Sequence, residues 1–136
     1  MKMLASSLEN RVDEFDHLRN VMQEHQFTLG GNWDYDHGCY DRYLDEAHQV
    51  WLRVPFQTVS GRLDGESASN PDTSIRIGTP YVLKHVYNEG LDEEAQMRLT
   101  TALIDQFQEP VNSDAPVEDH WVEQAAQVLQ QVERDF

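Results

Sequence analysis

Basic side chains and cysteine are scarce in this sequence of 136 residues. It has 10 lysines and arginines against 25 aspartates and glutamates, which gives a formal charge of −15 at pH 7, and it has a single cysteine. Such a surplus of acidic groups repels phosphate backbones and anionic lipid headgroups, so nucleic acid and membrane surfaces are disfavoured as partners. One cysteine excludes an internal disulfide, and we expect Cys39 to be a small, partly buried residue.

Long apolar runs are also missing. No window approaches the length of a membrane span, and the first eight residues lack the apolar core of a signal peptide. The sequence therefore predicts a cytoplasmic protein. A chain of this length buries about two-thirds of the surface that its unfolded form exposes. One domain spanning residues 1–136 can therefore fold without a disulfide, a structural metal or a cofactor.

Signatures of catalysis are absent as well. There is no nucleophile elbow, HExxH motif, phosphate-binding loop or dinucleotide-binding glycine pattern. No catalytic residue can be named on this basis. The absence favours a non-enzymatic protein.

The most unusual stretch is 30–41, Gly-Gly-Asn-Trp-Asp-Tyr-Asp-His-Gly-Cys-Tyr-Asp. Its two leading glycines predict a turn with positive φ that ends a preceding helix. From Trp33 on, alternating aromatic and polar residues predict a strand with a bulge at Gly38. On a strand, Asp34 and Asp36 would share one face about 7 Å apart.

A calcium loop is the sharpest hypothesis for these carboxylates, and the spacing rejects it. With Asp34 at the first position, Cys39 falls where the loop requires glycine, and Asp45 falls where it requires glutamate. We therefore predict no metal site, and expect the carboxylates to cap turns or face water.

Elsewhere the patterns predict alternating elements. Apolar residues at helical spacing from Val12 to Met22 predict a helix that runs to about His25. Strands are expected at 49–56, pairing with the strand from Trp33 as a hairpin, at 75–77 and at 81–87. Pro55 places one end of its strand at an edge, a bulge or an exit. Residues 64–74 are rich in turn formers and predict a long surface loop.

The last third of the chain contains one ambiguous and one clear segment. Residues 91–107 fit either a short helical turn followed by a strand or one continuous helix. Asp114 near the N-cap and Pro116 in the first turn predict the start of an amphipathic helix. Its apolar stripe is Val117, Trp121, Val122, Ala125, Val128, Leu129 and Val132. The expected fold is therefore α+β, a mainly antiparallel sheet of about five strands with an N-terminal helix and this C-terminal helix packed on it.

Four runs resemble the YugN-like family of small proteins from Bacillus and its relatives. They are Phe27–Gly38, Trp51–Phe56, Ile77–Leu91 and Gln106–Pro110. The resemblance implies a small cytoplasmic α+β domain and supplies no mechanism, because the family has no established activity. Cys39 departs from the aromatic residue that the resemblance leads us to expect, which argues against a general role for its thiol.

Two functions follow from these observations. The first is a non-enzymatic binding or interaction protein, with homodimerisation open, that uses an aromatic and acidic surface around residues 30–41. The alternative is a small enzyme or metal-binding protein that uses Asp34 or Asp36 with His37 or His85. The candidate binding residues are Trp33, Asp34, Tyr35, Asp36, His37, Tyr40, Lys84, His85 and Tyr87. A pocket that holds Asp36 and both histidines would favour the alternative.

Overall fold

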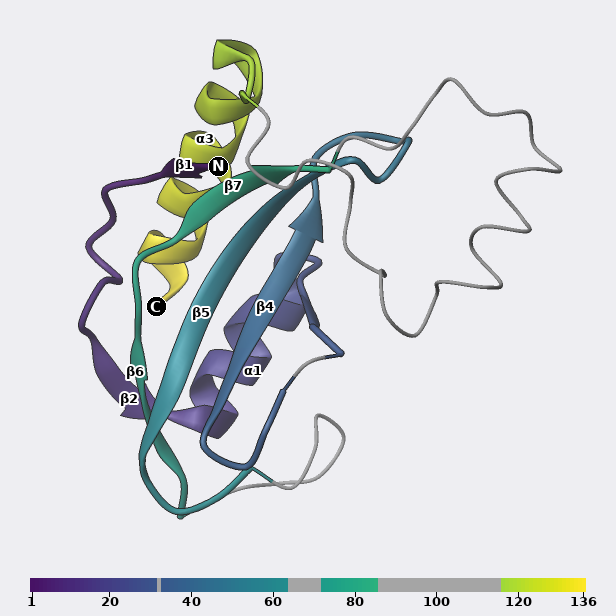
Figure 1. Ribbon diagram of the computed structural model, residues 1–136. Coiled ribbons are helices and arrows are strands. Elements are labelled where there is room, and N and C mark those ends of the chain that lie inside the picture. Colours follow the sequence, from purple (N-terminus) through teal and green to yellow (C-terminus); the bar gives the residue numbers. More distant parts are fainter. Residues whose placement is uncertain (32, 64–71, 86–115) are drawn as a thin grey trace, which may run out of the picture.

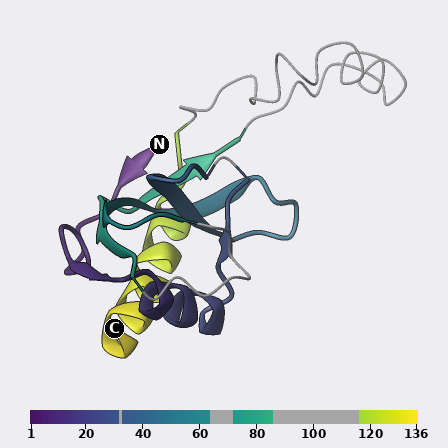
Figure 2. The ribbon, with the colours of Figure 1, turned by 90° about the horizontal axis from the view of Figure 1, so that it is seen from below.

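The computed structural model describes residues 1–31, 33–63, 72–85 and 116–136. These residues form two layers, a sheet and two helices that both lie on one of its faces (Figures 1 and 2). The elements are β1 (Lys2–Met3), β2 (Val12–Glu14), α1 (Phe15–Glu24), β3 (Thr28–Leu29), β4 (His37–Tyr43), β5 (Val50–Ser60), β6 (Ser74–Ile77), β7 (Tyr81–Lys84) and α3 (Asp119–Asp135). The predicted α+β class is confirmed.

Every strand pair in the described residues is antiparallel. The order is β1-β7-β5-β4-β3, while β6 pairs with the far end of β5 and β2 pairs with β6. Within the described residues the sheet thus has seven strands rather than about five. The difference comes from short strands such as β1 and β3, whose two residues are too few to show an alternating pattern.

The core lies between the sheet and the helices. Alternate residues of β5 point inward and are buried, as their period-2 pattern predicts. The four buried positions of α1 and the four of α3 face them from the other layer. The expected hairpin of β4 and β5 and the expected packing of the C-terminal stripe on the core are both confirmed.

The N-terminal helix begins later than its pattern predicts. Val12 lies in β2 with its side chain exposed, and α1 begins at Phe15. The chain pairs with β6 up to Glu14, so the edge of the sheet delays the helix.

The prediction that Gly30 and Gly31 end this helix is wrong. The helix ends at Glu24, and the chain reverses at Gln26, which has a φ of 66°. Neither glycine has a positive φ. Gly30 instead extends the pairing beyond β3, since its N–H donates to the carbonyl of Cys39 at 2.8 Å.

Pro55 lies in the middle of the sheet at a gap between two partner strands. On one side, β5 pairs with β7 up to Arg53 and with β6 from Phe56. The Pro55 carbonyl accepts the N–H of Gly78 in this gap at 2.8 Å. A proline is tolerated here because its missing N–H falls where no strand continues the ladder.

The C-terminal helix begins at Asp119, with Glu118 at its N-cap position. Val117 therefore precedes the helix rather than belonging to it. Several further predictions concern residues outside the described part of the chain. They are the Asp114 cap, the loop at 64–71 and the assignment of 91–107. The strand expected at 81–87 is shorter than predicted, because β7 ends at Lys84.

Candidate functional site

The stretch from Trp33 to His37, here called the Trp33–His37 turn, is a reversal of the chain, and only its last residue, His37, belongs to a strand. The N–H of Asp34 donates to the carbonyl of His37 at 2.8 Å, which leaves Tyr35 and Asp36 as a two-residue connection. The strand predicted from Trp33 is therefore wrong over its first four residues, because a tight turn can carry the same alternation of side chains.

The backbone of this turn is fixed by β5 and the chain that follows it. Thr58 donates to the carbonyl of Asp36 from both its N–H, at 2.8 Å, and its hydroxyl, at 3.0 Å. The N–H of Leu63 donates to the carbonyl of Tyr35 at 3.1 Å. Three hydrogen bonds from residues distant in sequence thus hold two adjacent carbonyls.

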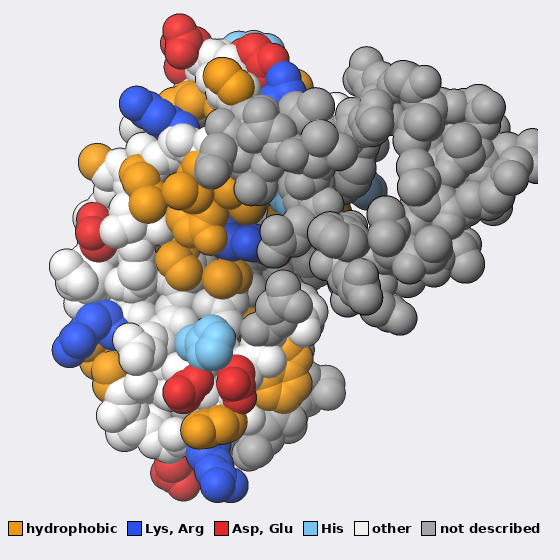
Figure 3. Space-filling model, viewed as in Figure 1, with side chains coloured by type: hydrophobic (Ala, Val, Ile, Leu, Met, Phe, Trp, Pro, Cys, Tyr) orange, Lys and Arg blue, Asp and Glu red, His pale blue; other side chains and the backbone are white. Residues whose placement is uncertain are grey.

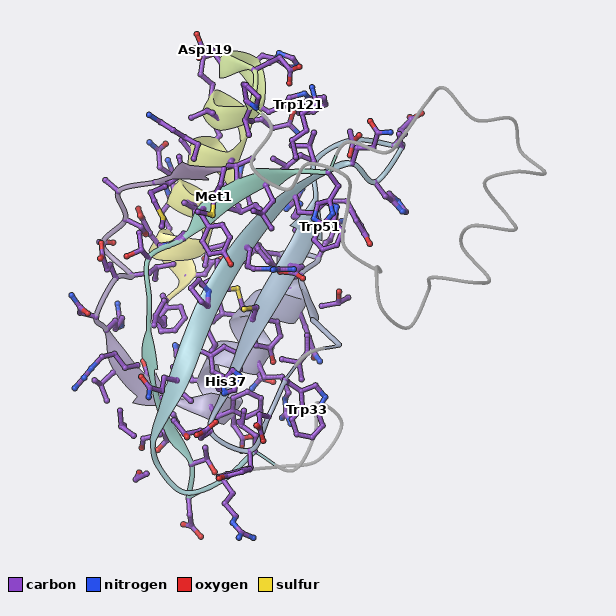
Figure 4. The ribbon with its side chains drawn as sticks, viewed as in Figure 1. Met1, Trp33, His37, Trp51, Asp119 and Trp121 are labelled. Carbon is purple, nitrogen blue, oxygen red and sulfur yellow. The ribbon has the colours of Figure 1, made fainter. Side chains whose placement is uncertain are left out.

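The side chains of the turn are exposed even though its backbone is fixed. Tyr35 is 60% exposed and Trp33 is 38% exposed. Asp36 and His37 contact each other through Oδ1 and Nδ1 at 2.7 Å, and Asp34 Oδ1 accepts the N–H of Tyr35 at 2.6 Å. Figure 3 shows one histidine and two acidic side chains together near one end of the outer sheet face, where Figure 4, in the same view, labels His37.

One potential ligand atom from each of Asp34, Asp36 and His37 lies within 4.8 Å of the other two. Oxygen and imidazole nitrogen at such spacing can converge on a cation. All three side chains are exposed. Two of the carboxylate oxygens already accept hydrogen bonds from the turn itself, which is the capping role that the sequence predicts.

Gly38 follows the turn directly and is not a bulge. It pairs with Phe56 within an unbroken register that runs from His37 to Tyr43. A Cβ at Gly38 would lie 2.8 Å from Cζ of Phe56 and 3.3 Å from Cβ of Trp33. Glycine is needed here for close approach, because the ring of Phe56 lies against the backbone of β4.

Tyr40 belongs to the core and not to the surface expected from the sequence. It is 0% exposed, and its ring packs 5.6 Å from that of Phe56 and 6.5 Å from that of Phe15. On β4 its side chain points inward, between outward-facing Cys39 and Asp41. Unbroken alternation from His37, without the bulge expected at Gly38, would have placed it on the inner face.

His85 lies at the opposite end of the sheet from the turn. Its N–H donates to the carbonyl of Gln49 at 2.7 Å, whereas His37 pairs with Gln57. The eight residues that separate Gln49 from Gln57 span about 25 Å. Figure 4 shows His37 and Trp51 well apart along the sheet, and Trp51 is the ring on which His85 stacks at 4.3 Å. No pocket can therefore bring His85 to Asp36.

Between these two ends, the outer face carries an ion pair that the sequence analysis missed. Arg53 donates to Asp41 through Nε at 2.8 Å and through Nη2 at 3.1 Å. Burial by itself lowers the pKa of Arg53, but the hydrogen bond and charge of Asp41 outweigh it and hold the pKa above its ordinary value. A count of hairpin register would have placed these two residues opposite each other.

The surroundings of this pair shift two neighbouring groups. Burial and then the charge of Arg53 lower the pKa of His85, with Asp41 acting against them. Burial raises the pKa of the Cys39 thiol, while Arg53 opposes this effect. Cys39 is half-buried, as the sequence predicts, and a raised pKa makes its thiol a poor nucleophile.

Of the two remaining candidates, Lys84 forms an ion pair with Glu118 at the start of α3. A hydrogen bond from Lys84 lowers the pKa of Glu118. Tyr87 lies outside the described residues. The candidate residues that the structure describes therefore fall into three separate places, the turn, the core and the far end of β7.

These features define a small α+β protein with one helix-covered sheet face and an aromatic and acidic hairpin turn. The chain belongs to the YugN-like family, whose model matches residues 3–136. It is similar to the uncharacterized protein YugN of Bacillus subtilis (strain 168), with 29% identity over 131 residues that cover 96% of this chain and 94% of the relative.

A solved structure shows the same fold. It is the crystal structure of an uncharacterized conserved protein YugN from Geobacillus kaustophilus HTA426, with a TM-score of 0.67 and 24% identity over 99% of this chain and 94% of that one. The relatives have no characterised function, so they assign none here. Within the described residues, neither helix has the length and apolar character needed to cross a membrane.

Proposed function

We propose that this protein is a non-enzymatic, cytoplasmic binding protein whose recognition element is the Trp33–His37 turn. One observation carries the proposal: the turn combines a fixed backbone with exposed side chains. The carbonyls of Tyr35 and Asp36 are held by Thr58 and Leu63, while the Tyr35 ring is mostly open to solvent. A fixed backbone lowers the entropy lost when exposed side chains bind a partner.

The chemistry of the turn favours a basic partner. Asp34 and Asp36 supply two carboxylates, and Trp33 and Tyr35 supply aromatic faces that attract guanidinium and ammonium groups. The overall charge of −15 adds long-range attraction for the same class of partner and repels nucleic acid. A Lys- or Arg-bearing segment of another protein is therefore the ligand class that we propose.

Titration with a short arginine-rich peptide tests the proposal. Amide chemical shifts at residues 33–37 should move most, binding should weaken with added salt, and an Asp34→Asn/Asp36→Asn variant should bind at least about tenfold more weakly. The matched control is Glu46→Gln/Glu123→Gln, which removes the same charge at exposed positions away from the turn. Equal weakening in both variants would show attraction by net charge alone and would overturn the proposal.

Metal binding by the same turn is the competing function. It rests on the convergence of Asp34, Asp36 and His37 ligand atoms within 4.8 Å. Exposed groups that are already hydrogen-bonded within the turn offer a cation little beyond what water offers. The thermal melts described at the end of the Discussion separate the two functions.

A further inference from the structure

The outer face of the sheet, opposite the helices, has a composition unlike the rest of the chain. Pairing registers place six large apolar side chains on it, from four adjacent strands: Met3, Tyr43, Trp51, Pro55, Tyr81 and Leu83. Of these, Met3 and Tyr43 are exposed, Trp51, Pro55 and Tyr81 are half-buried, and Leu83 is buried. Figure 3 shows hydrophobic side chains gathered on this face. The exposed face of an antiparallel sheet is normally polar, and contiguous apolar patches mark contact sites.

The strand residues of this face also carry no net charge, although the carboxylates of Asp34 and Asp36 lie at one end of it. In the strands that the structure describes, its acidic residues are Glu14 and Asp41 and its basic residues are Arg53 and Arg76, so two negative charges balance two positive ones. Arg53 and Asp41 neutralise each other directly through two hydrogen bonds. The whole chain, in contrast, carries a formal charge of −15.

From this neutrality we infer that the outer face associates with a second copy of the same chain. Two molecules that each carry a large negative charge repel each other over most of their surfaces. Between the balanced strands of the outer face, two copies can approach with less repulsion than the net charge of the chain would give. A neutral, apolar face gives a strongly basic partner no charges to pair with, which distinguishes it from the Trp33–His37 turn. The inference does not rest on the function proposed for that turn.

The size of the face sets the expected strength of association. Four strands about 4.8 Å apart, with at most about five residues along each rising about 3.3 Å per residue, cover no more than roughly 300 Å² per copy. That area lies below the typical size of stable interfaces, which is about 800 Å² per partner. We therefore expect a weak dimer in equilibrium with monomer. Salt should strengthen this dimer, because screening reduces the repulsion between the two acidic molecules.

Sedimentation equilibrium of the full chain tests the inference. We expect wild type to show reversible dimerisation that increases from roughly 0.05 M to 0.5 M sodium chloride. Met3→Glu/Tyr43→Glu, which places charges at two exposed outer-face positions, should raise the dimer dissociation constant at least about tenfold. The matched control, Tyr35→Glu, adds a charge at an exposed tyrosine of the turn. It should leave the dimer dissociation constant within a factor of about two of the wild-type value.

Met3→Glu alone serves if the double variant does not fold, because Met3 lies on a two-residue edge strand and is 55% exposed. A wild type that stays monomeric up to about 1 mM, the range where weak interfaces dissociate, would overturn the inference. The inference would also be overturned if salt weakened dimerisation, or if Tyr35→Glu disrupted the dimer as strongly as Met3→Glu/Tyr43→Glu does.

Discussion

Arg53 on β5 and Asp41 on β4 lie directly opposite each other in the central hairpin, joined by two hydrogen bonds on the outer face of the sheet. Their side chains are 23% and 14% exposed, so solvent screens this pair less than a surface ion pair. Removing one partner leaves the other charge partly buried and uncompensated.

Asp41→Ala and Arg53→Met should each lower the free energy of unfolding by about 1.5–3 kcal/mol. The double variant should lose less than the sum, with a coupling energy of about 1 kcal/mol or more. Denaturant unfolding of the four proteins measures this cycle. The control cycle uses Arg11 and Asp13, whose 3.8 Å contact is more exposed and should give a coupling below about 0.5 kcal/mol. Equal coupling in the two cycles would contradict the proposed role of burial.

Acid should destabilise the protein partly through His85. Burial and Arg53 lower its pKa below the ordinary value of 6.5, so the folded state resists a proton that the unfolded state accepts. The unfolded state then binds more protons as pH falls below about 6.5, and the free energy of unfolding falls with it. Above that range His85 is neutral in both states and contributes no pH dependence.

His85→Gln should therefore flatten the decline of unfolding free energy between pH 7 and about 5. Denaturant unfolding at a series of pH values measures the slope, and an NMR titration of the imidazole measures its pKa directly. Because His85 stacks on Trp51 at 4.3 Å, indole fluorescence should change over the same pH range in wild type. Parallel slopes in the variant and wild type would show that other groups carry the acid sensitivity.

The close approach of Gly38 to Phe56 gives a third prediction with a control in the same chain. A methyl group at Gly38 would lie 2.8 Å from the Phe56 ring, which is itself packed against Phe15 and Tyr40. The ring cannot move without disturbing the core, so Gly38→Ala should cost about 1–3 kcal/mol. Gly31→Ala, which meets nothing within 4 Å, should change stability by less than about 0.5 kcal/mol.

Chemical denaturation of the two alanine variants decides the point. Gly38→Ala should lower the free energy of unfolding less in a Phe56→Leu background than in wild type, because the ring atom that meets the methyl group is then absent. Equal stability of Gly38→Ala and wild type would mean that the core accommodates the methyl group.

Local patterns in the sequence predicted the elements whose side chains are sorted by burial. The inward residues of β5 repeat every second position, and the stripe of α3 repeats at helical spacing, so each pattern records one buried face. The Trp33–His37 turn could not be found this way. Its backbone is fixed by Thr58 and Leu63, which lie more than 20 residues further along the chain.

The ion pair of Asp41 and Arg53 depends in the same way on information that no single segment holds. The two partners are 12 residues apart in sequence, and their contact becomes predictable only once the hairpin register is fixed. The placement of His85 is a further example, because its distance from Asp36 follows from the pairing of β7 with the opposite end of β5. Candidate residues that look like one site in sequence are therefore divided by the topology of the sheet.

The last prediction separates a recognition turn from a metal site. Trp33 is 38% exposed and packs its Cβ near Gly38, so Trp33→Ala should cost about 1–2 kcal/mol rather than the 3–5 kcal/mol of a buried tryptophan. Asp36→Asn keeps the shape and most hydrogen-bonding capacity of an exposed side chain and should cost about 1 kcal/mol or less.

Thermal melts with and without calcium, magnesium, manganese and zinc should leave the melting temperature of wild type unchanged, because a turn used for recognition holds its carboxylates in water without a cation. A site in which Asp34 and Asp36 repel each other would behave in the opposite way: Asp36→Asn would stabilise the free protein, and the metal would raise the melting temperature of wild type alone. That pair of results would assign the turn to metal binding.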